Sequence, residues 1–450
     1  MMLTAGDHSH NLGQYPDGLR GPMIIRDPND PHKGEYDEEV ILTVSDWYHN
    51  ESLTLVREML VTTNTEFKPP IPNSIIVNDG QGAKITFKKG KRYRFRFINL
   101  AALAGAIINF ASHKMKVIMN DASTIKAQEV DMLKIAAAQR YDFIVEAGSD
   151  ESDNVPFLVA LDVNRDYTNP ALGDPVWPFN YTGYLVVDSS KPTTSIDVVH
   201  TIDPADDAKF KPYDGAAAWG PYNKIIKLDF QFCIDENGYP RACFNNVTYI
   251  AQKTPTLYTA ATTGDANTNA EIYGQVNPHI VYHGDIVQIV VNNLDAAAHP
   301  FHLHGHHFQV LYRGASQEGK WSGEDTGYTA EPPTRDTVMV FGESHAVLRF
   351  KANNPGVYLF HCHIEWHVEM GLTATIIEDP DTLKGMSFPD DHIDICKAQN
   401  IPYQGNAAGN TQNYTDMSGF LTVPPTTYDG STYLGSKKRR SSVGFWGESN

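Results

Sequence analysis

Short apolar runs separated by turn residues dominate the pattern of this chain. Segments such as 39–48 (EVILTVSDWY), 92–100 (RYRFRFINL), 285–294 (DIVQIVVNNL) and 356–364 (GVYLFHCHI) are rich in β-branched and aromatic residues. Gly, Pro, Asn and Asp stand between such runs, and long helical periodicity is scarce. This pattern is typical of sandwiches or barrels of short strands, so we predict an all-β fold.

The same pattern divides the chain into segments. Residues 191–214 are polar, contain proline and show little periodicity, so we interpret them as a linker. They separate a predicted domain at 36–190 from a second one at 215–400. Residues 1–35 are too short to form a domain and are interpreted as the remnant of another. Residues 401–450 form an extension that ends in SKKRRSSVGFWGESN, and we expect its end to be disordered.

Composition narrows the class of protein. The 450 residues carry a formal net charge of -18, which argues against a nucleic-acid partner. No apolar run reaches the roughly 18 residues of a membrane helix, and the first residues do not resemble a signal peptide. Four Asn-x-Ser/Thr sequons nevertheless favour a secreted glycoprotein. The sequons begin at Asn50, Asn180, Asn246 and Asn413.

The four cysteines have different expected roles. Cys233 and Cys243 flank Asn237-Gly238, a strong hairpin-turn signal, so they face each other either as a disulfide or as a reduced pair. Cys396 is then left without a partner in this sequence. Cys362 stands among histidines and is a candidate metal ligand.

Two short blocks, HPFHLHGHH (299–307) and HCHIEWH (361–367), hold eight of the 18 histidines. Imidazole together with thiolate selects copper, zinc or iron over hard cations. In a strand, His361 and His363 share one face and Cys362 points to the other, so one tripeptide can serve two metal sites. A trigonal His2Cys set is the blue-copper electron-transfer centre, and a zinc site is the alternative.

These blocks resemble the two C-terminal motifs of the multicopper oxidases, the family of laccases and fungal ferroxidases. DHSHNLGQYPDGLRGPMIIRDP (7–28) is similar to their second motif, and the likeness covers about residues 7–400. The resemblance implies tandem cupredoxin-like Greek-key β-sandwich domains, four coppers and reduction of O2 to water. It implies type 1 copper at His299, Cys362 and His367 with Leu372 in the axial position, type 2 copper at His302, type 3 copper at His8, His10, His304, His361 and His363, and proton delivery by Glu365.

The chain departs from the family pattern at its start. The first copper motif, HxHG, is absent, so six of the family's eight cluster histidines are present. We therefore expect a sequence truncated at its N-terminus. A copper-binding chain without oxidase turnover is accordingly one of the functional hypotheses.

Substrate residues are expected beside His299. By resemblance, Asp295 and Tyr273 match groups near the ferroxidase iron site, and Asp121 matches an acid with which laccases anchor phenols. Met119 stands where the resemblance places a ferroxidase glutamate, and Asp206 or Asp207 matches a third iron acid loosely. With no membrane segment and no carboxylate at Met119, the sequence favours a laccase-like oxidase of phenolic or pigment-type substrates, and we expect a monomer. A ferroxidase acting on Fe(II) is the alternative.

Overall fold

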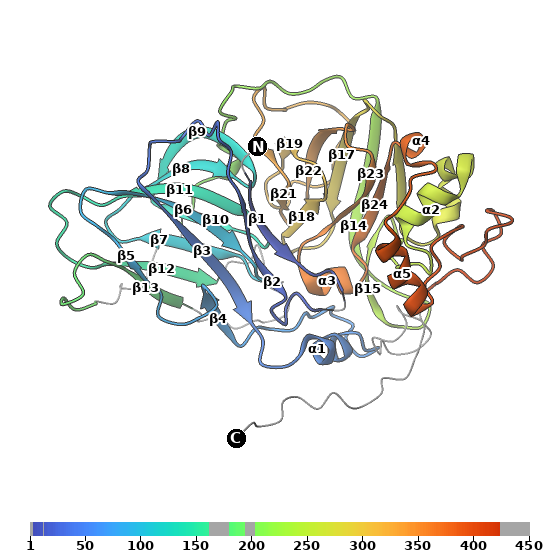
Figure 1. Cartoon of the computed structure of the whole chain (residues 1–450), viewed down its shortest axis with the longest axis horizontal. Coiled ribbons are helices and arrows are strands. Elements are labelled where there is room, and N and C mark those ends of the chain that lie inside the picture. Colours follow the sequence, from blue (N-terminus) through green and yellow to red (C-terminus); the bar gives the residue numbers. More distant parts are fainter. Residues whose placement is uncertain (1–2, 12, 162–179, 194–202, 424–450) are drawn as a thin grey trace.

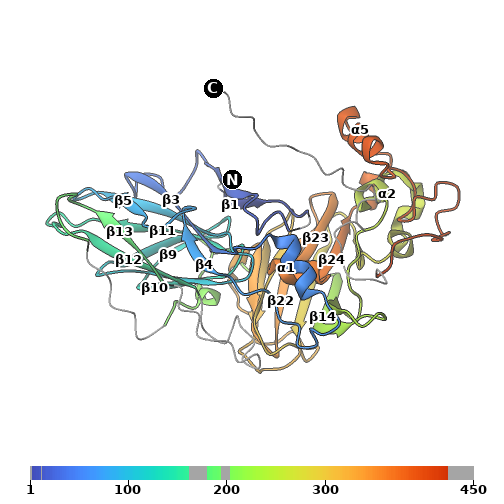
Figure 2. The ribbon, with the colours of Figure 1, turned by 90° about the horizontal axis from the view of Figure 1, so that it is seen from below.

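The computed structural model describes residues 3–11, 13–161, 180–193 and 203–423, and it confirms the all-β prediction. Four large sheets form two sandwiches that lie side by side (Figures 1 and 2). The strands of one sandwich lie between residues 38 and 186, and those of the other between 224 and 378. The domain boundaries drawn from the sequence remain predictions.

The first sandwich packs a six-stranded sheet on a five-stranded one. Aromatic side chains fill the space between the sheets; the rings of Phe95 and Phe110, for example, lie 5.2 Å apart. The six strands, in sheet order, are β4 (Ser74–Val77), β3 (Glu38–Trp47), β6 (Arg92–Asn99), β11 (Arg140–Glu146), β8 (Met115–Asn120) and β9 (Ser123–Val130). The five are β10 (Met132–Ile135), β7 (Ala106–Phe110), β12 (Val155–Leu161), β13 (Asn180–Val186) and β5 (Lys84–Thr86).

The second sandwich repeats this plan. Phe230 and Phe301 approach each other at 6.1 Å from opposite sheets and belong to a continuous buried core. Its six-stranded sheet is β15 (Pro240–Phe244), β14 (Lys224–Ile234), β17 (Ile286–Asn293), β22 (Ser344–Lys351), β19 (Phe308–Arg313) and β20 (Thr334–Arg335). Its five-stranded sheet is β16 (Pro278–Val281), β24 (Thr373–Glu378), β23 (Gly356–Cys362), β18 (His299–Leu303) and β21 (Thr337–Val340).

A two-stranded ribbon, β1 (Leu3–His8) and β2 (Arg20–Ile25), lies against the first sandwich near the second (Figure 1). The Trp366 indole of the second sandwich donates a hydrogen bond to the Tyr48 hydroxyl, 3.0 Å away, at the end of β3. The two sandwiches therefore share a packed, hydrogen-bonded interface.

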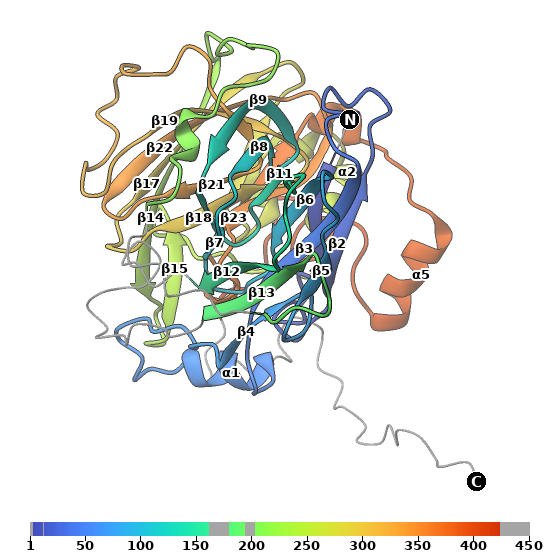
Figure 3. The ribbon, with the colours of Figure 1, turned by 90° about the vertical axis from the view of Figure 1, so that its left-hand side faces the viewer.

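The helices are short and lie outside the sheets. They are α1 (Ser52–Met59), α2 (Thr256–Thr262), α3 (Glu365–Glu369), α4 (Pro380–Leu383), α5 (Asp390–Gln399) and the 3-10 helices η2 (Asp207–Lys209), η3 (Gly264–Thr268) and η4 (Ala270–Tyr273). Helix α5 stands apart from the strands (Figure 3). None of the helices in the described part of the chain is long and apolar enough to cross a membrane.

Two segments that the sequence presents as linker and extension are tied to the sandwiches where they are described. In the linker, the Ala205 amide bonds to the Met132 carbonyl and the Tyr213 amide to the Thr124 carbonyl. In the extension, the buried Ala407 donates its amide to the Ile272 carbonyl. The extension is therefore ordered at its start, whereas its basic end lies outside the described residues.

The cysteines resolve the alternatives left open by the sequence. Cys233 and Cys243 form a disulfide between β14 and β15, with their Cα atoms 6.3 Å apart. Cys362 and Cys396 are free and buried, and the Cys396 thiol lies 3.6 Å from the Tyr258 hydroxyl.

Candidate metal centre

His299, Cys362 and His367 meet in the core of the second sandwich. The Cys362 Sγ lies 3.8 Å from His299 Nδ1 and 3.6 Å from His367 Nδ1, and the two nitrogens are 3.2 Å apart. All three residues are buried. Burial raises the pKa of the Cys362 thiol and holds the pKa of His367 well below its ordinary value. This compact His2Cys set, which we call the blue-site cluster, offers one sulfur and two neutral nitrogens to a metal.

The surroundings of the blue-site cluster are apolar. The ring of Phe230 lies edge-on to His299 at 4.6 Å, and that of Phe232 lies 5.2 Å from His367. Leu372 is fully buried and accepts a backbone hydrogen bond from the Cys362 amide. A leucine side chain has no donor atom, so His299, Cys362 and His367 would be the residues that hold a metal here.

A carboxylate stands at the outer edge of the blue-site cluster. Asp295 Oδ2 lies 2.9 Å from His299 Nε2, the ring nitrogen that points away from Cys362. Although burial opposes it, the hydrogen bond and the charge of His299 lower the pKa of Asp295, which is therefore ionised at neutral pH. The Asp295 side chain is 13% exposed, so it lies between the buried His299 ring and solvent.

A second set of histidines gathers where β1, β18 and β23 meet. The metal-binding nitrogens of His10, His304 and His361 all lie within 4.8 Å of one another. The ring centroid of His363 is 4.9 Å from that of His8 and 5.6 Å from that of His302. We call these six residues the histidine cluster: His8, His10, His302, His304, His361 and His363.

The described environment keeps rings of the histidine cluster neutral, so that their nitrogens are free to bind a metal. Partial burial and the neighbouring His10 lower the pKa of His8 to about 3, so its ring is neutral. His8 Nε2 and His363 Nδ1 are buried nitrogens without a hydrogen-bond partner. Such orphaned atoms are costly unless a ligand satisfies them, so the residues present fit a bound metal.

Local structure places the two sets next to each other. His361, Cys362 and His363 follow one another at the end of β23, and His302 pairs with His361 across β18. Gly305 follows His304 with φ +70, and a Cβ there would collide with Tyr358. One thiol and two imidazoles in an apolar setting, beside an imidazole cluster, are donors that suit copper.

Glu365 begins helix α3 and stands in the sequence between His363 of the histidine cluster and His367 of the blue-site cluster. Its side chain is buried, and its backbone amide bonds to the Ala102 carbonyl of the first sandwich. Burial, together with the charge of Glu369, raises the pKa of Glu365 well above its ordinary value. The carboxyl group can therefore carry a proton at neutral pH.

Asp121 and Tyr273, which resemblance predicts as substrate residues, and Met119, where it places a ferroxidase glutamate, are all buried. The substrate role of Asp121 and Tyr273 stays a prediction, and the structure shows other partners for both side chains. Asp121 is fully buried and both its oxygens bind Arg335, at 2.9 and 3.1 Å. Met119 is buried in a small cluster with Ile118 and Ile144. Tyr273 donates to the Asn267 carbonyl inside a separate core. In each case distant segments cover the side chain, which a local motif does not reveal.

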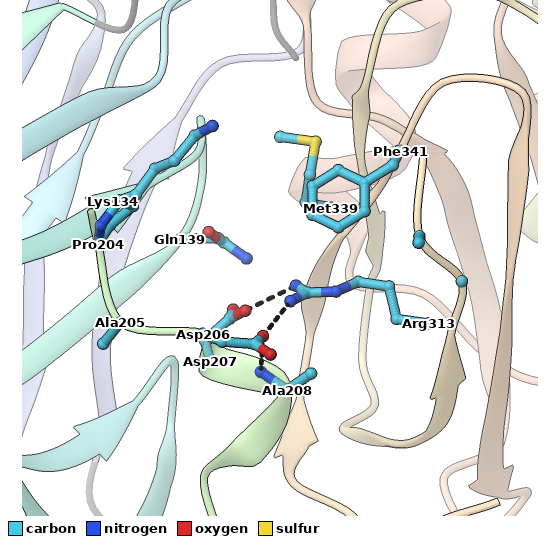
Figure 4. Close-up of a pocket in the computed structure, with 12 residues that line it drawn as sticks. Lys134, Gln139, Pro204, Ala205, Asp206, Asp207, Ala208, Arg313, Met339 and Phe341 are labelled. Atoms are coloured by element: carbon cyan, nitrogen blue, oxygen red, sulfur yellow. Dashed lines mark hydrogen bonds and ion pairs between the residues drawn. The ribbon is translucent and has the colours of Figure 1, made fainter. Parts of the chain in front are cut away.

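Asp206 and Asp207, the loose matches to a third iron acid, both form ion pairs in this structure. They face Arg313 across a pocket of about 420 Å³ between the sandwiches, at 2.7 and 2.6 Å (Figure 4). Asp207 also pairs with Arg335 and receives the Tyr141 hydroxyl. Both carboxylates therefore form ion pairs with arginines of the second sandwich, against which the linker packs.

The sequence analysis missed Glu66, an exposed acid in the loop after α1. The ring of its neighbour Phe67 stacks on Phe232 at 5.0 Å, and Phe232 lies over His367. Glu66 forms an ion pair with Lys68 at 2.6 Å. No motif marks this acid, because only the stack of Phe67 on Phe232 brings its segment near the blue-site cluster.

Comparisons with known proteins agree with this geometry. Models of the multicopper oxidase family match residues 38–171 and 249–382. The iron transport multicopper oxidase fetC of Epichloe festucae is 44% identical over 95% of this chain and 69% of its own length. The FET3 protein of Gibberella zeae is 40% identical over 93% of this chain and 68% of its own.

Solved structures give the same family. The crystal structure of Fet3p, a multicopper oxidase that functions in iron import, superposes with a TM-score of 0.87 at 34% identity, over 93% of this chain and 80% of that one. A laccase from Botrytis aclada has a TM-score of 0.73 at 25% identity, over 88% and 73%. From its matched segments, its relatives and its fold, this chain belongs to the multicopper oxidase family.

Proposed function

We propose that this multicopper oxidase is a ferroxidase, which removes electrons from Fe(II) at the blue-site cluster and delivers them to dioxygen. As a family member it is a copper-dependent oxidoreductase with type 1, type 2 and type 3 copper that uses O2 as acceptor. We assign type 1 copper to His299, Cys362 and His367, with Leu372 axial. We assign type 2 copper to His302, and type 3 copper to His8, His10, His304, His361 and His363.

One observation carries the proposal: the Asp295 carboxylate bonds directly to His299 Nε2. An ionised oxygen donor suits a cation such as Fe(II). A carboxylate can also accept a hydrogen bond from a phenol hydroxyl, so the similarity to iron transport oxidases decides between the two substrates. An iron ion held by Asp295 is separated from the blue-site cluster by one hydrogen bond and one imidazole ring. The net charge of -18 further favours the approach of a cation.

The relatives support the same choice. The similar proteins from Epichloe festucae and Gibberella zeae are both named iron transport multicopper oxidases. The sequence-based preference for a phenolic substrate depended on the missing carboxylate at Met119 and on the missing membrane segment. Met119 is fully buried in a small apolar cluster with Ile118 and Ile144, so the lack of a carboxylate there says little about the substrate. Ferroxidase, the alternative in the sequence analysis, is therefore the better supported function.

The protein's own residues do three things in the proposed reaction. Asp295, with Glu66 on the nearby segment, attracts and orients Fe(II). The packing of Phe230, Phe232 and Leu372 excludes water from the blue-site cluster. Glu365 holds a proton on its carboxyl group beside the histidine cluster, where reduction of oxygen consumes protons. When bound, copper supplies the one-electron steps that connect four ferrous ions to one dioxygen.

We also propose that the chain passes through the secretory pathway. The sequon residues Asn50, Asn180, Asn246 and Asn413 are all exposed, so each could carry a glycan without disturbing the core. Treatment of the protein from its native host with an endoglycosidase should reduce its apparent mass; no change would contradict glycosylation.

Substitution of Asp295 tests the proposed substrate. We expect Asp295→Asn to lower kcat/KM for Fe(II) at least tenfold and kcat/KM for a diphenol much less, because Asn keeps an oxygen that accepts from a phenol but loses the charge that attracts a cation. Glu343→Gln is the matched control, since Glu343 is exposed and its amide bonds to the Asp295 carbonyl. Equal losses for both substrates would contradict the proposal. Oxygen uptake driven by Fe(II) separates an oxidase from a chain that only binds copper.

A further inference from the structure

His302 is held in one tautomer by the backbone of β20 and β21. Its Nδ1 lies 2.9 Å from the Asp336 carbonyl oxygen and 3.1 Å from Thr337 Oγ1. The Thr337 hydroxyl donates to Asp336 Oδ1 at 2.9 Å, so it accepts from the ring. Since a carbonyl only accepts, the proton of His302 belongs on Nδ1, and Nε2 keeps its lone pair for the histidine cluster.

The carbonyl that orients His302 is itself held from the other sandwich. Asp336 forms a two-pronged ion pair with Arg140 of β11, with nitrogen–oxygen distances of 2.6 and 2.5 Å. The side chains of Arg140 and Asp336 are 5% and 10% exposed. A buried, bidentate pair of this kind fixes orientation as well as position.

Asp121 completes the support. Its Oδ2 accepts from the Asp336 and Thr337 amides at 3.3 Å, and its oxygens bind the Arg335 guanidinium. Its Oδ1 also accepts from the Arg140 amide at 3.0 Å. Two carboxylates and two guanidinium groups, contributed by both sandwiches, therefore surround the Asp336 carbonyl that accepts the hydrogen bond from His302.

We infer that the Arg140–Asp336 ion pair, backed by Asp121, is a positioning device through which the first sandwich sets the orientation of His302. The inference rests on the proposed assignment of His302 as a copper ligand. It makes these residues positioning residues, since none of them contacts the metal-binding nitrogen. Asp121, which resemblance predicted as a substrate acid, thus joins Arg140 and Asp336 in holding the carbonyl that orients His302.

The test begins with the copper-free full-length chain labelled with nitrogen-15 at histidine. Ring-nitrogen shifts report which nitrogen carries the proton, and His302→Gln identifies the His302 signal. We expect the wild-type proton on Nδ1 and a mixed population of tautomers in Asp336→Asn. Glu331→Gln, which removes a part-exposed carboxylate that pairs with Lys126 of the first sandwich and does not contact His302, should leave the signal unchanged.

Copper(II) titration followed by electron paramagnetic resonance provides the second measurement. We expect Asp336→Asn to weaken binding of non-blue copper about tenfold or more, as loss of an outer-sphere partner does, and to preserve the blue copper signal. Arg140→Lys, which keeps the charge but loses one prong, should show a smaller change in both measurements. If Asp336→Asn does not fold, the same two measurements on Arg140→Lys test the proposal.

The outcomes separate the positioning role of the Arg140–Asp336 pair from the assignment of His302 as a copper ligand. A His302 signal that is the same in a folded Asp336→Asn variant and in wild type would overturn the positioning role, as would a wild-type proton on Nε2. A tautomer change without non-blue copper binding in wild type would support positioning and refute the ligand assignment of His302.

Discussion

At the scale of single residues, the thiolate of Cys362 defines the blue-site cluster. Its sulfur is the one soft donor between His299 and His367, and Leu372 offers no substitute. We predict that Cys362→Ser abolishes the intense blue absorption band of the copper-loaded chain, because the band requires copper–sulfur bonding. Absorption spectroscopy of the copper-loaded variant checks this. Copper content should fall by one ion, and a blue colour that persists would refute the assignment.

The metal-binding residues were predictable from the sequence because they lie in short motifs. HxH and HCH spacing places ligands on known faces of β18 and β23, so the two sets gather as expected. Substrate residues were not predictable in this way. Asp121 and Tyr273 are covered by segments far away in the chain, whereas Glu66 comes to the site through one aromatic stack.

At the scale of elements, buried hydrogen bonds hold the end of β24 to the turn that follows β18. Glu378 is fully buried; one oxygen binds His306 Nε2 at 2.5 Å and the other receives the Asn354 amide at 2.6 Å. We predict that Glu378→Ala destabilises the chain by about 2 kcal/mol, since the buried His306 ring and the Asn354 amide both lose their partner. Denaturant unfolding of the apo chain measures this.

Controls make that measurement specific. Asp394→Ala, which removes an exposed acid of α5, should change the free energy of unfolding little. Glu378→Gln keeps an acceptor and should cost less than Glu378→Ala. Equal stability of Glu378→Ala and wild type would contradict the structural role of this residue.

The alternation of apolar and polar residues predicted the strands and the sandwich class, but not how the polar segments dock. The linker residues 203–214 showed little periodicity because they bond by backbone groups and by ion pairs rather than by an apolar face. Arg140, Arg335 and Asp336 have charges typical of surface loops, and only pairing across the interface permits their burial. A pattern based on hydrophobicity cannot predict such pairs.

At the scale of the whole molecule, the linker joins the two sandwiches through Asp207. Although burial opposes it, Arg313 and Arg335 lower the pKa of Asp207 from 3.8 to about 2. The paired carboxylate therefore stabilises the fold fully above about pH 4, and this contribution declines as pH falls towards 2.

Asp207→Asn tests that contribution. We predict a loss of about 2 kcal/mol in unfolding free energy at neutral pH, from the size of the pKa shift. The difference from wild type should shrink as pH falls below about 4. Urea unfolding across pH measures it, and a difference independent of pH would contradict the ion-pair account.

The central claim is that Fe(II) gives electrons to the blue-site cluster beside Asp295. The most direct test is anaerobic mixing of the oxidised, copper-loaded chain with Fe(II) or with hydroquinone, followed by the bleaching of the blue band. This measures the entry of electrons without requiring the reduction of oxygen. We predict that Fe(II) bleaches the band at least tenfold faster than hydroquinone at equal concentration. Bleaching that is as fast or faster with hydroquinone would contradict the proposed ferroxidase function.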